Sequence, residues 1–380
     1  MSDRPTPVGA LLRAAPPDRL PEVVADHLRQ QHSAHRSEVL LGDLTMGALW
    51  PVLDESGAPG GALALRCFGS QRPVTDITAT GFNRVYLPLS AWGERVGVLL
   101  VETGQPTGNG LTEQLTAVAD DLTVALLAAG HNTDRYRRVT RRQRMTMAAE
   151  LQWELLPGRS LGDDRFLLAG QLEPAYAVHG DNYDWAVTGD KLTVTVLNGF
   201  GDGMAAAHLT TTAVTAMRNA RRSGASLVEQ AGLACDAIYA RDAGAAHAAT
   251  LLLEIDLVSG QVEAVDAGSP RAMIARAGEV RTVDLDEQLP LGMFGDARYE
   301  TQQFQLQPGD RLLVVSDGVH AATPGGRSPF GESALINALR RTRLQPATEA
   351  VGTVMRSLRE YHAGQDPDDD AVTVCLDWLR

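Results

Sequence analysis

Four short acidic turns in the second half of the chain constrain its fold and chemistry more than any other feature. They read HGDNYD at residues 179–184, LNGFGDG at 197–203, VSDG at 315–318 and DDDA at 368–371. Three of them follow or enter an apolar, strand-like run and place a short oxygen-bearing side chain beside glycine or another carboxylate. Hard divalent cations such as Mg²⁺ or Mn²⁺ require oxygen ligands on rigid turns, without thiolate or imidazole. The sequence therefore indicates a divalent-metal site.

Each turn taken alone has an ordinary structural explanation. Asp317-Gly318 is compatible with an Asx or type I′ turn, and residues 366–370 are compatible with a solvated acidic loop. Asn198 stands where a fourth carboxylate would be expected. It is equally compatible with a satisfied turn residue, because Asn-Gly is favoured in turns whatever the chemistry. The order and spacing of the four turns together favour a common site.

Length and composition predict a cytoplasmic protein with two domains. The chain has 380 residues, 44% hydrophobic and 21% charged, which is enough for two separate cores. Cys67, Cys235 and Cys375 lie far apart in apolar surroundings, which predicts buried thiols in a reducing compartment. No apolar run approaches the roughly 18 residues of a membrane helix, and the start MSDRPTP lacks a signal-peptide core. The net charge of −13 disfavours nucleic acid and anionic lipid as partners.

Residues 1–130 are predicted to form a small α+β sensor-like domain. Helices are expected over 20–32 and 111–129, where apolar residues recur at helical spacing. A hairpin turn is expected at 92–95. The expected strands are residues 44–50, 61–68, 85–89 and 96–102, so that Cys67 is expected on a strand.

Residues 131–157 are predicted to form one long helix. Its first half carries six arginines, its second half carries an apolar stripe that includes Leu151 and Leu155, and Pro157-Gly158 ends it. Two interpretations stay open: a solvated linker helix, or a coupling helix whose stripe packs against a second copy in a homodimer. A nucleic-acid role is disfavoured because no aromatic residues interleave with the arginines.

Residues 158–380 are predicted to form an α+β domain in which helices cover antiparallel sheets. Strand-like runs follow one another as hairpins, and a helical block interrupts them. The expected strands are residues 185–187, 191–197, 249–255, 262–266, 271–276, 311–315 and 372–376, and the expected helices are 204–222, 227–240, 332–339 and 349–362.

From about Leu151 to the C-terminus, the chain resembles the SpoIIE-like branch of the PPM (type 2C) metal-dependent protein phosphatases. The matching motifs are LQxxLLP at 151–157, GDxYD at 180–184, NGxGxGxAA at 198–206, AGSP at 267–270, PLG at 290–292, PGD at 308–310, SDG at 316–318 and DD at 369–370. The resemblance implies an α-β-β-α sandwich with a two-metal centre at one edge of its sheets.

The resemblance also implies roles for individual residues. Asp181, Asp317 and Asp369 would form the catalytic centre as ligands of two Mn²⁺ or Mg²⁺ ions or of their water molecules. Gly199 would offer its backbone carbonyl as a ligand, and position 198 would bridge both ions. In the family mechanism the ions activate a water molecule that attacks the phosphorus of phosphoserine or phosphothreonine in line.

Three positions depart from the family pattern. Asn198 has one good acceptor oxygen, so it can ligate one ion but bridges two poorly. Asp202 and Ser269 each replace a histidine of the pattern. Asp202 or Asp184 could partly restore the charge that is missing at Asn198, and the sequence leaves this point open.

Residues 1–130 resemble a GAF-type sensory domain through the strand at 85–89, the strand at 97–101 and the closing helix. The expected fold class is thus α+β: a PPM-type sandwich preceded by a GAF-like domain and a linker helix. The expected function is a regulatory phosphatase acting on a phosphorylated partner-switching protein, of the anti-sigma-factor-antagonist type, under control of the N-terminal domain. The alternative is a pseudophosphatase that binds a partner without turnover, which Asn198 favours.

Overall fold

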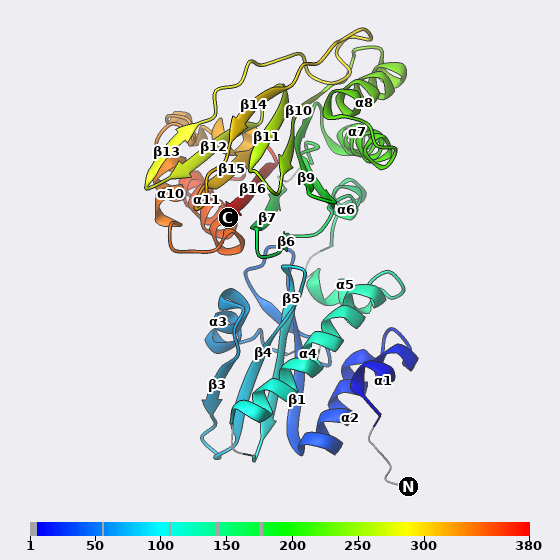
Figure 1. The fold of residues 1–380 in the computed structure, drawn as a ribbon, viewed down its shortest axis with the longest axis vertical. Coiled ribbons are helices and arrows are strands. Elements are labelled where there is room, and N and C mark those ends of the chain that lie inside the picture. Colours follow the sequence, from blue (N-terminus) through cyan, green and yellow to red (C-terminus); the bar gives the residue numbers. More distant parts are fainter. Residues whose placement is uncertain (1–5, 55–56, 106–107, 142–143, 175–177) are drawn as a thin grey trace. The chain divides into compact units, whose positions relative to one another are not determined.

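Three antiparallel sheets organise the chain (Figure 1). The computed structural model describes residues 6–54, 57–105, 108–141, 144–174 and 178–380. They divide into two units, one ending at Arg144 and the other beginning at Met145, and each unit has its own hydrophobic core. Among the helices of this described part, none combines the length and the apolar character that crossing a membrane would need.

The first unit is a five-stranded sheet with helices on both faces. Its strand order is β2 (Leu49–Pro51), β1 (Ala34–Gly42), β5 (Glu94–Thr103), β4 (Asn83–Ala91), β3 (Val74–Ile77). One face packs against α1 (Val8–Ala14), α2 (Leu20–His32), α4 (Asn109–Ala129) and α5 (Arg135–Thr140), and the other against α3 (Ala62–Ser70). The helices predicted over 20–32 and 111–129 and the strands predicted over 85–89 and 96–102 are confirmed.

The strand predicted over residues 61–68 is wrong, because this segment forms α3. Ala64, Cys67 and Phe68 are buried on one side of that helix, and their spacing of three and four residues is helical. Cys67 is therefore a buried thiol on a helix. The strand predicted over 44–50 is extended only at its end, in β2, and β1 and β3 have no counterpart among the predicted strands.

The single helix predicted over residues 131–157 is also wrong. The chain forms α5 in the first unit and α6 (Met147–Glu154) in the second. Arg141 is extended and ends α5. Thr146 is extended too, and its hydroxyl accepts a hydrogen bond from the Ala149 amide, so it caps the start of a new helix. The two units are therefore not joined by one continuous helix.

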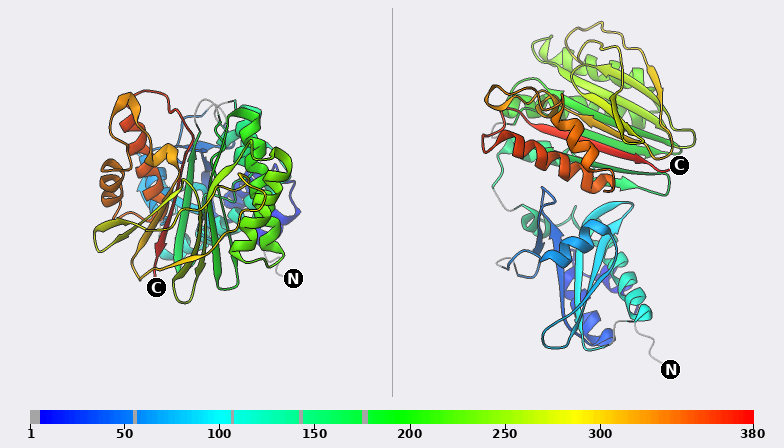
Figure 2. Two further views of the ribbon diagram at one scale, coloured as in Figure 1. Left: turned by 90° about the horizontal axis from the view of Figure 1, so that it is seen from above. Right: turned by 90° about the vertical axis from the view of Figure 1, so that its left-hand side faces the viewer.

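The second unit is a sandwich of two sheets with helices on each outer side, and it confirms the predicted α-β-β-α architecture (Figure 2). The first sheet has the order β14 (Gln302–Gln305), β11 (Gln261–Ala267), β10 (Ala248–Asp256), β9 (Lys191–Gly199), β8 (Asn182–Thr188). It is covered by α7 (Gly203–Arg222) and α8 (Leu227–Asp242). The second sheet has the order β13 (Glu279–Thr282), β12 (Arg271–Arg276), β15 (Arg311–Val315), β16 (Ala371–Trp378), β7 (Phe166–Glu173), β6 (Ser160–Gly162). It is covered by α10 (Ala334–Arg341) and α11 (Ala347–His362).

Alternate residues of the inner strands fill the space between the two sheets. Tyr183 and Trp185 of β8 point into it, with stacked rings whose centroids are 4.9 Å apart. Gly170 of the opposite sheet lies under these rings, and a Cβ at this position would come within 2.7 Å of the tyrosine ring. The alternation matters for the site, because it also turns position 181 towards the space between the sheets.

Gly97→Ala is expected to destabilise the first unit. Gly97 lies in β5 between β1 and β4, where an added Cβ would overlap the Leu40 carbonyl oxygen. The strands would have to separate, which should lower the free energy of unfolding by about 1–3 kcal/mol. Gly110→Ala in α4 is the matched control, because its Cβ would meet open space and alanine favours a helix. Urea unfolding of both variants measures the difference, and equal stabilities would contradict the close approach at Gly97.

Candidate metal centre

Two strand pairs bring the acidic turns to one edge of the sandwich. In the first sheet, the β8–β9 register places Asp181 opposite Asn198, one position beyond the last paired residues of the two strands. In the second sheet, β15 and β16 are paired. Asp317 lies two positions after the end of β15, and Asp369 lies two positions before the start of β16. The turns are therefore the neighbouring ends of strands from both sheets.

The Asp370 carboxylate joins the turns of the two sheets. Its Oδ2 accepts hydrogen bonds from the main-chain amides of His179 (2.8 Å) and Gly180 (3.0 Å) and from the side-chain amide of Gln152 (2.7 Å). Hydrogen bonds to an ionised acceptor are among the stronger ones in proteins. Asp370 was not among the predicted site residues. Asp370 lies two residues before Val372, which is buried between the sheets, so the alternation of a strand places both side chains on the same face. This spacing is the signal that could have identified Asp370.

Gln152 connects helix α6 to the same turn. Besides Asp370, its side-chain amide donates to the Asp181 main-chain carbonyl oxygen (2.6 Å), and the main-chain carbonyl of Gln152 accepts from the Asn182 side chain (2.9 Å). Gln152 is completely buried. The first acidic turn is thereby held against α6 at two consecutive residues, through the backbone of Asp181 and the side chain of Asn182.

Asp181 is a buried carboxylate without a counter-charge. It is 0% exposed, and neither of its carboxylate oxygens has a hydrogen bond of normal geometry to a described residue. The pKa of Asp181 is raised well above its usual range, first by burial and then by the negative charges of Asp369 and Asp370. The nearby Ser316 hydroxyl lowers this pKa. A buried, unpaired carboxylate is unfavourable. A divalent cation is a partner that would relieve this, so Asp181 fits its predicted role.

Asp317 and Asp369 line a small cavity of about 170 Å³, together with Asp368 and His362. One carboxylate oxygen of Asp317 is buried without a hydrogen-bond partner among the described residues. Burial first, and then the charge of Asp317, raise the pKa of Asp369 to about 6. The three predicted acidic residues therefore lie close enough to repel one another, which is typical of carboxylates that share a cation.

Glycines allow the main chain to pack tightly around this cluster. A Cβ at Gly318 would overlap the Asp370 carbonyl oxygen. A Cβ at Gly199 would lie 3.0 Å from the Thr210 hydroxyl and 3.1 Å from the Gly180 carbonyl oxygen. Side chains at these positions would push the turns apart.

Asn198 lies at the same edge and directs its side-chain amide towards Ser269. The distance from Nδ2 to the Ser269 hydroxyl is 3.4 Å, and the Ser269 carbonyl oxygen lies 2.9 Å from Nε2 of His320. An amide has a single strong acceptor oxygen and no charge. The expected deficit of one negative charge at this position therefore persists in the folded protein.

Asp184 does not replace the missing charge. Asp184 is buried on the helix-facing side of β8 and forms ion pairs with Arg218 (2.7 Å) and Arg221 (2.9 Å) of α7. Its charge is therefore neutralised away from the cluster, and the suggestion that Asp184 restores the charge is wrong. Asp202 is exposed at the start of α7 and makes no capping hydrogen bond.

The donor set suits a hard cation. Within the described ranges, no three His, Cys, Asp or Glu side chains converge tightly enough to hold an ion by themselves. A bound Mn²⁺ or Mg²⁺ would thus complete its shell with backbone carbonyls and water, which is usual for Mg²⁺ in proteins. Buried carboxylate oxygens at Asp181 and Asp317 without hydrogen-bond donors are the observation that favours this fit.

An α-β-β-α sandwich with a cluster of aspartates at one edge, between its sheets, defines the class of PPM-type serine/threonine phosphatases. The family model for stage II sporulation protein E (SpoIIE) matches residues 188–379, just over half of the chain. The chain belongs to the SpoIIE family.

Solved structures agree with this fold. The PP2C phosphatase domain with a fragment of the regulatory domain of SpoIIE from Bacillus subtilis is 16% identical, with a TM-score of 0.50, over 80% of this chain and 81% of that chain. The RsbU and RsbW domains of a Mycobacterium tuberculosis protein are 20% identical, with a TM-score of 0.50, over 57% of this chain. The match spans 62% of that mycobacterial chain, less than two thirds of its length.

Gln152→Leu is expected to destabilise the second unit and to weaken metal binding. The change removes the donor to Asp370 and to the Asp181 carbonyl, leaving two buried acceptors without that partner, which should lower the free energy of unfolding by about 1–3 kcal/mol. Calorimetric titration with Mn²⁺ and urea unfolding measure the two effects. Gln365→Leu, at an exposed position of the same unit, is the control. Equal behaviour of the two variants would contradict the role of Gln152.

The metal-free protein is expected to lose stability as the pH rises from about 4 to about 6. The pKa of Asp369 is about 6 in the folded protein, against 3.8 ordinarily. The folded state therefore binds more protons than the unfolded state in this range, and the free energy of unfolding falls with rising pH. Asp369→Asn should flatten this part of the profile. Thermal unfolding in EDTA at several pH values tests it, and parallel profiles for both proteins would refute it.

Proposed function

We propose that this chain is a Mn²⁺- or Mg²⁺-dependent protein serine/threonine phosphatase that acts on a phosphorylated regulatory protein of the partner-switching type. The observation that carries the proposal is the gathering of Asp181, Asp317 and Asp369 at one sheet edge, with the pKa of Asp181 and of Asp369 raised. When bound, two metal ions would activate a water molecule for in-line attack on phosphorus. Asp181 would hold them from the buried side, and Asp317 and Asp369 from the side of the cavity.

The surroundings of the cluster favour a protein substrate. The cavity lined by Asp317 and Asp369 has a volume of only about 170 Å³, which suits a phosphorylated side chain better than a large free ligand. Phe200, two residues after Asn198, is 56% exposed and stacks on the His247 ring with centroids 4.8 Å apart. An exposed, ordered aromatic pair beside the site offers apolar area to the surface of a partner protein.

The N-terminal unit would regulate this site. The proposal includes GAF-like sensing by that unit, homodimer formation and a cytoplasmic location. Helix α6 is the first element of the second unit, and its Gln152 contacts both the Asp181 backbone and the Asp370 carboxylate. A displacement of α6 would move these contacts, and a change in the N-terminal unit could thereby alter the geometry of the acidic turns.

A second candidate is a pseudophosphatase that binds a phosphoprotein without turnover. The observation in its favour is Asn198, because Asp184, which is paired with Arg218 and Arg221, does not supply the missing charge. A neutral ligand between two dications should lower the affinity for at least one of them.

Turnover of para-nitrophenyl phosphate and of a phosphoserine protein, with and without millimolar Mn²⁺, tests the proposed activity. Manganese-dependent turnover should fall by about 100-fold or more in Asp181→Ala and Asp317→Ala, because each change removes a carboxylate ligand. Asp236→Ala, at an exposed position on α8, is the control. Absence of turnover, together with absence of Mn²⁺ binding by calorimetry, would refute the phosphatase proposal.

Asn198→Asp separates the two candidates. The added carboxylate should tighten Mn²⁺ binding by about 10-fold or more, because it restores one negative charge beside the ions. If the natural protein already turns over substrate, the variant should retain turnover at lower Mn²⁺ concentration. A silent natural protein whose variant becomes active would instead establish the pseudophosphatase.

A further inference from the structure

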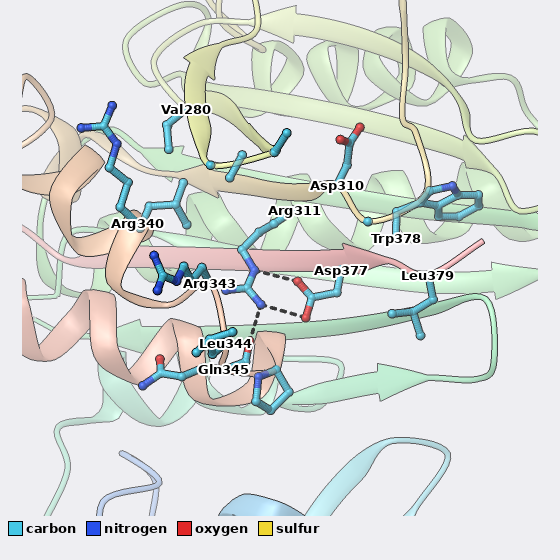
Figure 3. A pocket seen from close by; sticks show the side chains of 16 residues that line it. Val280, Asp310, Arg311, Arg340, Arg343, Leu344, Gln345, Asp377, Trp378 and Leu379 are labelled. Carbon is cyan, nitrogen blue, oxygen red and sulfur yellow. Dashed lines mark hydrogen bonds and ion pairs between the residues drawn. The ribbon is translucent and has the colours of Figure 1, made fainter.

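A second cavity lies in the sandwich unit at the end of β15 and β16 that is remote from the acidic cluster (Figure 3). It has a volume of about 490 Å³, within the usual range for ligand sites. Its walls come from the β12–β13 hairpin, the loop between α10 and α11, and the end of β16. Arg311 begins β15 in this wall, whereas Asp317 follows the other end of the same strand, about 20 Å away at the rise of an extended chain.

The carboxylates in this wall are already neutralised within the protein. Asp377 accepts two hydrogen bonds from the Arg311 guanidinium, at 2.7 Å and 2.9 Å, as Figure 3 shows. Asp310 is buried and paired with Arg276 at 2.6 Å. The wall therefore presents no free negative charge to a ligand.

Two arginines of the same cavity have no such partner. Arg340, in the last turn of α10, and Arg343, in the loop after it, are exposed, and neither forms an ion pair with any residue that the structure describes. Figure 3 shows both on the α10 side of the cavity. They place two unneutralised positive charges at this cavity, on a chain whose net charge is −13.

Much of the remaining lining is aliphatic. Val280 and Leu339 contribute to it, and Leu344 and Leu379 lie at its margin, 87% and 52% exposed. Large apolar side chains with this degree of exposure beside a cavity offer area that a bound molecule would cover. Trp378, the one aromatic residue among the lining residues described, is buried in the core, so the cavity offers no stacking surface for a nucleobase.

We propose that this cavity binds an organic anion with an aliphatic body. Its carboxylate or phosphate head would pair with Arg340 and Arg343, since a guanidinium matches either group with two parallel hydrogen bonds. Its aliphatic body would lie against Val280, Leu339 and Leu344. This site shares no residue with the acidic cluster, and the inference stands independently of phosphatase activity.

Calorimetric titration of the full chain with octanoate, octyl phosphate and octanol tests the proposal. Saturable binding of at least one of the two anions, with one site per chain, is expected, and the tighter of them identifies the head group. Octanol should bind at least about 10-fold more weakly, because it lacks the charge. Arg340→Gln and Arg343→Gln should each weaken binding of the anion about 5-fold or more. Arg356→Gln, an exposed arginine of α11, should leave it unchanged.

Three results would overturn the proposal. One is the absence of saturable binding for both anions at millimolar concentration. Another is octanol binding as tightly as the anions, which would show an apolar surface without charge recognition. The third is equal affinity in Arg340→Gln, Arg343→Gln and Arg356→Gln, which would leave the two arginines with the sole role of stabilising the C-terminal end of α10.

Discussion

The buried carboxyl group of Asp370 is the constraint on which the candidate site depends. It is the point where the last strand, the first acidic turn and helix α6 meet, through hydrogen bonds from His179, Gly180 and Gln152. In a buried, low-dielectric environment such bonds are strong, and an acceptor that loses them is strongly destabilised. One carboxylate, hydrogen-bonded within the protein, therefore keeps the edge of the sandwich in place. The neighbouring acidic side chains then face the space where an ion would bind.

The order and spacing of the four turns predicted a common site, and the resemblance to the PPM phosphatases implied its place at one edge of the sandwich. In antiparallel sheets, turns at the ends of paired strands become neighbours, so a linear order of motifs carries spatial information. The role of Asp370 was missed, because a run of three aspartates does not by itself show which side chain turns inwards, and only the two-residue spacing from the buried Val372 distinguishes Asp370. The same limit applies to Asp184, whose partners Arg218 and Arg221 lie 34 and 37 residues further along the chain.

Local patterns failed where tertiary context decides the conformation. The apolar residues of α3 were read as a strand, although Ala64, Cys67 and Phe68 share one helical face. The arginine-rich connection at residues 131–157 was predicted to be one helix, because the sequence favours a helix both before and after the interruption. The extended backbone at Arg141 and the cap at Thr146 interrupt it. The shortage of negative charge among the ligands, by contrast, was predicted from Asn198 alone: three carboxylates, at Asp181, Asp317 and Asp369, would face two expected dications.

The tight packing at Gly318 has a consequence for comparing sequences across the SpoIIE family. The carbonyl oxygen of Asp370 occupies the space that any side chain at position 318 would need. A relative that has lost catalysis but keeps this fold would come under the same selection to retain the glycine. The glycine of an Asp-Gly pair is thus a marker of architecture, and only the acidic partner can serve as a marker of chemistry. Pseudoenzymes in this lineage should be sought by substitutions of the carboxylates, with the glycines still in place.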